Sequence, residues 1–254
     1  MNSRTPPALC VCLLVLLAGC NGFFPGPDAT TGPTPQADYP PGLVMNGVAD
    51  PDALTGAHED ALANTSYELT VARTISRDGR VRGEENATVR FGRGDQRLTH
   101  SRTAGPFYAG RSSRTAIWSN DSVTAIRRVD ENGTHFDHIE AGFSSASWGT
   151  RFYDVFRFDV NRTADGFTLT STGVRDRNAL GTTFTNTSNV SVTMQLDRQG
   201  VIQSYRLELD GNPLITNGTT RYHLTETVNL TRVGGLTVER PPWVATALNR
   251  SGGN

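Results

Sequence analysis

The chain has 254 residues and a formal net charge of -1, and all 24 of its basic residues are arginine because lysine is absent. A near-neutral charge gives no electrostatic footprint for nucleic acid or for an anionic membrane surface, so we expect no nucleic-acid partner. The abundance of threonine, glycine and asparagine, without long apolar helical stretches after residue 20, favours a β-rich domain.

The first twenty residues predict export and lipid attachment. Arg4 supplies a positive charge before a short apolar run, Ala8 to Leu17, which is too short to span a bilayer. The run ends in Leu-Ala-Gly-Cys, which resembles a lipobox, the cleavage site of lipoproteins. Residues 1–19 are therefore interpreted as a signal peptide, and Cys20 as the lipid-anchored first residue of the mature chain. The alternative is an ordinary secretory signal with a chance cysteine.

The other two cysteines, Cys10 and Cys12, leave with the leader, so no disulfide framework is expected. Residues 20–45 are rich in Pro, Gly and Thr and are predicted to be a disordered tether. A single domain is expected over residues 46–246, followed by a disordered tail over 247–254. This organisation places the protein on the extracytoplasmic face of the cell membrane, held there by Cys20.

Ten Asn-X-Ser/Thr sequons indicate an extracellular glycoprotein, although a threonine-rich β-protein also accumulates such motifs passively. In three predicted strands the alternation of apolar residues leaves the sequon asparagine on the opposite, solvent-facing side. The sequon asparagines are Asn64, Asn86, Asn120, Asn132, Asn161, Asn186, Asn189, Asn217, Asn229 and Asn249.

A helix is predicted at the start of the domain, because Asp50 is a good N-cap, Pro51 suits the first helical position, and an apolar stripe follows. Alternating apolar residues then predict strands with turns between them. A second helix is predicted over residues 146–157, although Phe156 and Phe158 also fit strand alternation. The strands are expected over residues 67–71, 81–91, 97–103, 114–118, 122–129, 134–139, 167–174, 190–196, 201–209 and 222–233.

Residues 175–187 are expected to be irregular, and the last hairpin is expected to turn near Gly211-Asn212-Pro213. The element order predicts an α+β, mostly β fold. It would contain a strongly curved antiparallel sheet, a half-open barrel, with one or two helices covering its concave apolar face.

Several short motifs occur in a familiar order: the lipobox, the tether, "YPPGL" at residues 39–43, a helix leading into "SYELTV", and the late "TVERPPWV" at residues 237–244. Together they resemble a family of uncharacterised haloarchaeal lipoproteins, which resembles in turn the LolA/LppX-like lipoprotein carrier fold. That resemblance implies binding of a lipid or another lipophilic molecule. It carries over no functional residue, because such carriers use a diffuse apolar lining.

No catalytic or metal-binding motif stands out. A Gly-X-Ser-X-Gly elbow is absent, and His135 and His138 would point to opposite faces of one strand. We therefore expect no enzyme activity, no metal and no cofactor. Large side chains in the middle and late segments are interpreted as the lining of a ligand cavity, with plain core packing as the alternative. They are Trp118, Trp148, Phe152, Phe156, Met194, Tyr205 and Tyr222.

The sequence thus favours a membrane-anchored extracytoplasmic lipoprotein that binds a lipophilic ligand in an apolar cavity. The alternative is a surface glycoprotein that acts as a structural or protein-interaction module without a cavity. The carrier hypothesis requires a pocket of a few hundred Å³. The module hypothesis requires an exposed apolar patch or a long unpaired sheet edge. The sequence identifies no protein partner.

Overall fold

The fold is taken from a computed structural model. It describes residues 39–94, 96–108, 112–142, 148–176, 180, 184–214 and 219–249. The chain divides into two units, residues 1–36 and 37–254, and every described residue belongs to the second. The predicted signal peptide, Cys20 and the tether up to residue 38 lie outside the described residues. Among the described helices, none is long and apolar enough to cross a membrane.

The described elements follow one another in a mostly β order. They are β1 Leu43–Val44, β2 Gly47–Val48, α1 Pro51–Ala63, β3 Tyr67–Arg77, β4 Arg80–Phe91, β5 Arg97–Ala104, η1 Pro106–Tyr108, β6 Ser113–Ser119, β7 Thr124–Asp130, β8 Gly133–Ile139, α2 Phe152–Val155, β9 Phe156–Arg162, β10 Gly166–Val174, β11 Phe184–Asp197, β12 Ile202–Pro213, β13 Tyr222–Val233 and α3 Trp243–Asn249.

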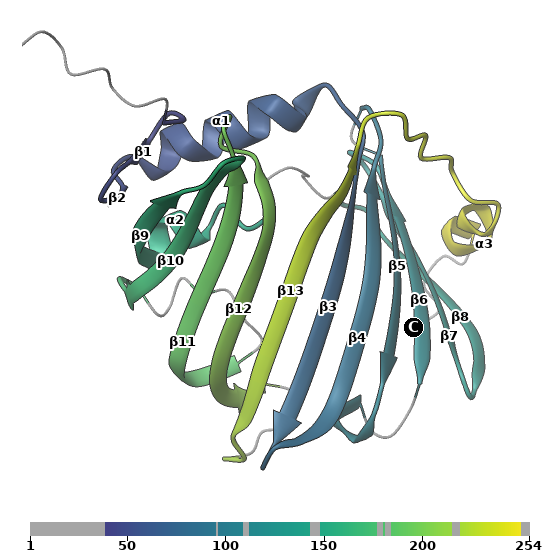
Figure 1. Ribbon diagram of the computed structural model, residues 1–254. Helices are drawn as coiled ribbons and strands as arrows, with labels where there is room; N and C mark the ends of the chain where they lie inside the picture. The colour runs from purple at the N-terminus through teal and green to yellow at the C-terminus, as the bar shows by residue number, and fades with distance from the viewer. Residues whose placement is uncertain are drawn as a thin grey trace, which may run out of the picture. The chain divides into compact units, whose positions relative to one another are not determined.

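One 11-stranded antiparallel sheet dominates the fold, in the order β8-β7-β6-β5-β4-β3-β13-β12-β11-β10-β9 (Figure 1). The sheet is curved and open, with β8 and β9 at its edges. Its halves are two meanders, β3 to β8 and β9 to β13, which meet where β3 pairs with β13. The prediction of a mostly β fold with a large curved antiparallel sheet and a few helices is confirmed.

Helix α1 begins where the sequence predicts it. The Asp50 carboxylate accepts a hydrogen bond from the backbone N–H of Ala53 at 3.0 Å, and Pro51 occupies the first position. The buried side chains Leu54, His58 and Leu62 are spaced four residues apart, so they share one face of the helix. That face lies against the end of the sheet at the β11–β12 turn (Figure 1).

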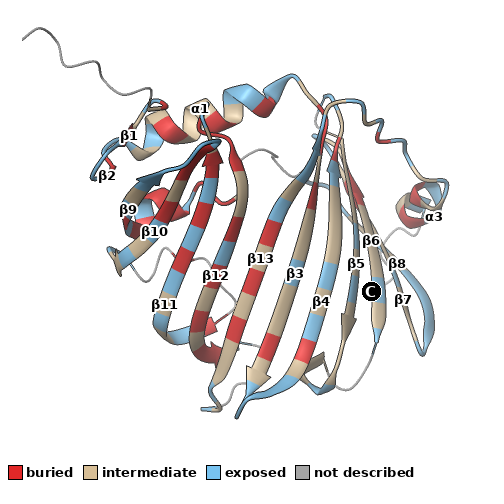
Figure 2. Ribbon diagram, in the orientation of Figure 1, coloured by how far each residue is buried: buried red, intermediate tan, exposed pale blue. Residues whose placement is uncertain are grey.

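The main core lies between α1, α2 and one face of the β9–β13 half, and it continues over the same face of β3 and β4. Burial alternates along β11 and β12, so that every second side chain points into this core (Figure 2). Phe152, Phe156, Leu169 and Met194 are completely inaccessible to solvent. We call this side of the sheet the aromatic face.

A second, smaller cluster lies on the opposite side of the sheet, which we call the outer face. Here Val244 and Ala247 of α3 pack against Trp118 and Ala125 of β6 and β7. The sequence analysis had placed a disordered tail from residue 247, but α3 continues to Asn249 because its apolar side chains are buried in this cluster. Residues 250–254 lie outside the described residues.

The predicted helix over residues 146–157 is largely wrong. Residues 143–147 are outside the described residues, and α2 covers only four residues before the backbone becomes extended at Phe156 (φ -116°, ψ 156°). Phe156 and Phe158 are buried while Arg157 and Asp159 are exposed, so the strand alternation prevails in β9.

The predicted hairpin of the last two strands is confirmed, because β12 pairs with β13, but the position predicted for its turn, residues 211–213, is wrong. β12 continues to Pro213, which pairs with Phe184 at the start of β11, so residues 184–187 are strand rather than irregular. A Cβ atom on Gly211 would lie 3.0 Å from the Thr185 carbonyl oxygen. Glycine here permits close approach of two strands and does not make a turn.

The folded part also begins before residue 46, the predicted end of the tether. Tyr39 stacks on Phe167 with ring centroids 5.0 Å apart, and Leu43 is 2% exposed. Burial of these apolar side chains orders residues that composition alone assigns to a flexible linker.

We predict that His58 fixes α1 to the sheet through a neutral ring. Its Nδ1 accepts a hydrogen bond from the buried backbone N–H of Ile202 at 3.2 Å, and its ring meets Trp148 edge-on at 5.4 Å. His58→Ala should lower the free energy of unfolding in urea by about 2–4 kcal/mol, through a cavity and an unsatisfied N–H. His58→Asn retains an acceptor near Nδ1 and should lose about 1 kcal/mol less.

Asp60→Ala, at an exposed position of the same helix, is the control and should change stability by less than about 0.5 kcal/mol. Equal losses for His58→Ala and His58→Asn would show that the acceptor role is wrong.

Candidate functional site

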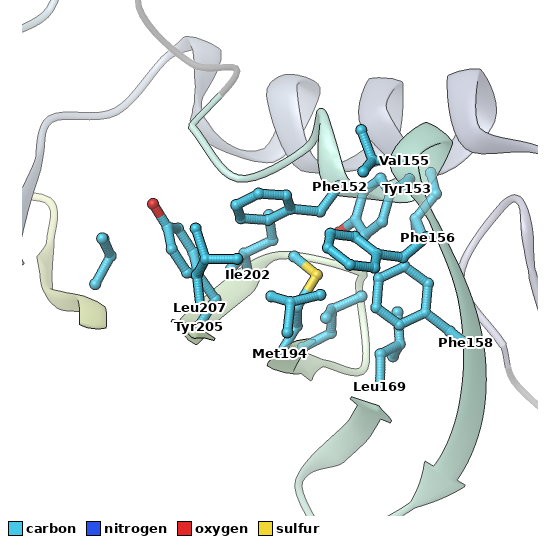
Figure 3. Close-up of a cluster of buried hydrophobic side chains, with 14 of the residues drawn as sticks. Phe152, Tyr153, Val155, Phe156, Phe158, Leu169, Met194, Ile202, Tyr205 and Leu207 are labelled. Atoms are coloured by element: carbon cyan, nitrogen blue, oxygen red, sulfur yellow. The ribbon is translucent and has the colours of Figure 1, made fainter. Parts of the chain in front are cut away.

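The side chains predicted to line a cavity lie in packed clusters. Phe152, Phe156 and Met194 are fully buried side by side beneath α1 (Figure 3). The Phe152 ring contacts Tyr205 edge-on at 5.0 Å, and the Tyr205 ring also stacks on Trp148 at 6.3 Å. Such close aromatic contacts are those of a core, which is the alternative that the sequence left open.

The remaining two predicted residues lie elsewhere. The ring of Tyr222, at the start of β13, meets Phe107 edge-on at 5.4 Å. Trp118 belongs to the outer-face cluster beneath α3, with the Arg240 guanidinium 5.6 Å from its ring centroid. None of the seven predicted residues lines the groove that the structure contains.

That groove lies on the outer face, across β3 to β7, and has a volume of about 630 Å³. Most of its lining comes from two adjacent rows of cross-strand partners, whose side chains point away from the aromatic face. One row is Ala72, Asn86, Arg102, Arg114 and Val129. The other is Thr70, Thr88, His100, Ala116 and Arg127.

The next row along the same face is Arg90, Leu98, Trp118, Ala125 and His138. Leu98, Trp118 and Ala125 of this row belong to the cluster that α3 covers. Helix α3 therefore borders the groove on one side without filling it.

The two ends of the groove differ in charge. Over β3 and β4 the rows present short neutral side chains, Thr70, Ala72, Asn86 and Thr88. Over β5 to β7 they present three arginines and a histidine, and the lining contains no carboxylate. Arg102 and Arg114 are direct cross-strand partners. A like-charge pair in this position destabilises a sheet.

Some other arginines of the sheet have carboxylate partners. Arg73 contacts Glu85 and Glu226, Arg90 contacts Glu68 at 2.7 Å, and Arg206 contacts Glu208 at 2.6 Å. The lining of the groove contains three arginines, Arg102, Arg114 and Arg127. Within the described part of the chain, none of them forms an ion pair.

Sequence analysis missed this site. The available signal was the alternation of basic and small residues in "THSRTA" and "SRTAIW", which puts His100, Arg102 and Arg114 on one side of their strands. Without the strand register, the same alternation is typical of a solvated face. Only the pairing of β5 with β6 brings Arg102 opposite Arg114.

A buried polar network lies on the aromatic face, beside the core. The Glu226 carboxylate accepts hydrogen bonds from the Tyr205 hydroxyl at 2.8 Å and from the Arg73 guanidinium, which also donates to Glu85 at 2.7 Å. Burial and the neighbouring Glu226 charge raise the pKa of Tyr205, so its hydroxyl stays a donor. Both carboxylates contact the single Arg73 guanidinium, and we assign the network a structural role.

A second polar cluster lies on the outer face of β11 to β13. Asp210 contacts Nδ1 of His223 at 2.9 Å, and Nε2 of His223 lies 3.4 Å from the Thr225 hydroxyl. The amide of Asn189 donates to Asp210 at 2.7 Å. Asn189 adopts a left-handed backbone (φ 48°) next to a register shift in β11, so the cluster holds an irregular strand in place.

Metal ligands do not gather in the described regions: no group of three or more His, Cys, Asp or Glu residues occurs there. The pairing of β7 with β8 puts His135 opposite Arg128 and His138 opposite Ala125, on different faces of the sheet. The two histidines therefore point in opposite directions, as the sequence predicts.

Nearly all of the described sequon asparagines are exposed to solvent. Asn120 is half-buried, because its side-chain oxygen accepts hydrogen bonds from the backbone N–H groups of Ser122 and Val123. Asn86 is exposed and lines the groove. Asn217 lies outside the described residues. The other exposed ones are Asn64, Asn132, Asn161, Asn186, Asn189, Asn229 and Asn249.

In comparisons with known proteins, no family model and no curated protein sequence matches this chain.

The Asp210 cluster generates a pH prediction. Partial burial opposes ionisation of this carboxyl, but hydrogen bonds from Asn189 and His223 outweigh it and lower the pKa of Asp210 below its ordinary value. A lowered carboxyl pKa contributes stability above the unfolded-state pKa, which is about 3.9. That contribution is lost as the pH falls through the folded-state pKa.

Asp210→Asn should therefore destabilise the protein at pH 7, and its difference from wild type should shrink below about pH 4. Denaturant unfolding of both chains between pH 3 and 7 measures this difference. A difference that stays constant across the range would contradict the assignment. Asp165→Asn, at an exposed position, is the control.

Proposed function

We propose that the protein is a membrane-anchored extracytoplasmic lipoprotein that binds a lipophilic ligand in the outer-face groove. The groove carries the proposal, because its volume of about 630 Å³ falls within the range of small-molecule sites. Its lining combines small apolar side chains, such as Ala72, Ala116 and Val129, with a larger number of polar ones.

The location of the ligand site differs from the sequence-based hypothesis. The seven side chains were expected to surround the ligand, but six of them pack on the aromatic face and Trp118 packs beneath α3 on the outer face. The groove instead lies on the outer face of the other half of the sheet. Among the described strands, only β3 and β4 carry core side chains on the aromatic face and groove side chains on the outer face.

Lipid attachment at Cys20 rests on the lipobox in the sequence. Between Cys20 and Tyr39, the first described residue, a fully extended chain would span at most roughly 70 Å. A tether of this length allows the sheet to present its groove to the membrane surface or to the medium.

We predict that Cys20→Ser releases the protein from membranes. A serine hydroxyl cannot take the thioether-linked lipid, and no described helix could replace the anchor. Immunoblotting of membrane and soluble fractions, with mass analysis of the intact chain, measures the change. Continued membrane association of Cys20→Ser would refute the anchor.

We predict that filling the groove abolishes ligand binding. Ala116 lies in its lining, so Ala116→Trp should occupy the space, and Ala72→Trp should do the same nearer β3. Native mass spectrometry of the Cys20→Ser chain, purified from its own host, should show extractable lipophilic adducts that both variants lose. Thr193→Trp, at an exposed position of β11, is the matched control and should keep them.

An adduct that survives both groove variants would place the ligand elsewhere. The absence of any adduct, together with failure to bind added amphiphiles, would overturn the proposal.

The alternative function, a surface glycoprotein that acts as a structural or protein-interaction module, is favoured by the position of Asn86. This sequon residue lines the groove, where a glycan would obstruct a small-molecule ligand. Peptide mass mapping of the native protein separates the two functions. Full occupancy of Asn86 by a glycan would favour the module, whereas an unmodified Asn86 leaves the groove accessible.

A further inference from the structure

We propose that the ligand of the groove is an amphiphile with one anionic headgroup, such as a phosphate monoester of a long alkyl chain. This inference rests on the proposed function and specifies its ligand. The headgroup binds over β5 to β7, among Arg102, Arg114 and Arg127. The alkyl chain lies over β3 and β4, against the short side chains of Thr70 and Ala72.

The cationic end of the groove is built by strand register. Arg102 and Arg114 are direct partners, and Arg127 is the diagonal neighbour of Arg114, since Arg114 pairs with Val129 two residues further along β7. His100 is the diagonal neighbour of Arg114 on β5. Cross-strand partners and diagonals lie within about 4.5–8 Å, so long side chains on them converge.

The repulsion between these arginines destabilises the sheet, and a bound anion would remove it. Directly opposed like charges repel, and no carboxylate of the lining offsets the charges. One acidic residue of this face, Glu84, is exposed and diagonal to Arg102 beyond the groove lining. A bound phosphate between the guanidinium groups would accept charge-assisted, bidentate hydrogen bonds and screen the repulsion.

The neutral end of the groove argues against a free inorganic anion as the natural ligand. A phosphate ion needs only the space among the cationic side chains, whereas the groove continues over two further strands. There it is lined by Thr70, Ala72 and Thr88, which offer methyl groups and no charge. An alkyl chain joined to the anion would bury this surface and add affinity.

The test is a calorimetric titration of the full chain carrying Cys20→Ser with four probes, each below its micellar concentration. The probes are dodecyl phosphate, dodecyl maltoside, dodecyltrimethylammonium and inorganic phosphate. We expect dodecyl phosphate to bind at least 10-fold more tightly than each of the other three. Its affinity should also fall with added salt, because screening weakens its contacts with the arginines.

Substitution of the arginines locates the headgroup. Arg102→Gln and Arg114→Gln should each weaken dodecyl phosphate binding by about 10-fold, the loss expected for one charge-assisted hydrogen bond. Both should leave dodecyl maltoside binding within about 2-fold. Neither should lower stability in urea, because each relieves a like-charge pair. Arg157→Gln, an exposed outward position on β9, is the matched control.

The outcomes separate this inference from the function on which it rests. Equal affinity for the three dodecyl compounds, unchanged in the arginine variants but lost in Ala116→Trp, would overturn the anionic headgroup and retain the groove as a lipophilic site. Inorganic phosphate binding as tightly as dodecyl phosphate would overturn the amphiphile in favour of a free anion. Binding of none of the probes would overturn both the inference and the proposed function.

Discussion

The pairing of β3 with β13 is the contact on which the sheet depends. These two strands are the only place where the N-terminal meander, β3 to β8, joins the C-terminal meander, β9 to β13, within the described strand order. The register of this pair sets which side chains of each half share a face. It puts Val71 opposite Val228 and Arg73 opposite Glu226, so the core side of one meander continues into the core side of the other. A slip by one residue would exchange the two faces throughout one half.

The contact of the half-buried Arg73 with the buried Glu226 makes such a slip costly. Glu226 is 5% exposed and is held by Arg73 and by the Tyr205 hydroxyl, so displacement of the register would leave a buried charge without partners. Buried ion pairs add little net stability, because desolvation offsets their attraction, but breaking one is expensive. The best physical role for this network is therefore to select one alignment of the two meanders. That alignment produces the aromatic face and, behind β3 to β7, the groove.

Sequence patterns predicted most strands and α1, because local alternation and an N-cap residue determine them. They failed where one spacing fits two structures. The spacing of Phe152, Phe156 and Phe158 fits both a helix and a strand. Burial against the neighbouring strands favours the strand, so α2 ends after one turn and β9 begins at Phe156. The segment Gly211-Asn212-Pro213 predicted a turn. The structure instead requires the glycine because the backbone of β12 approaches Phe184 of β11 closely at this position. The groove could not be predicted, since its lining extends from Thr70 to Val129 and only the register across five strands assembles it.

The absence of lysine changes how the groove arginines are interpreted. In this chain every basic side chain is arginine, so the choice of arginine over lysine at these three positions carries no information about a ligand. The informative feature is the distribution of carboxylates, which the chain has in about equal number to its arginines. Arg73, Arg90 and Arg206 each contact at least one carboxylate. The direct pairing of Arg102 with Arg114, without a carboxylate in the groove lining, instead costs stability at that place. The positive charge at one end of the groove is the physical basis for assigning an anionic headgroup to the ligand. The short neutral side chains at the other end are the basis for assigning it an apolar tail.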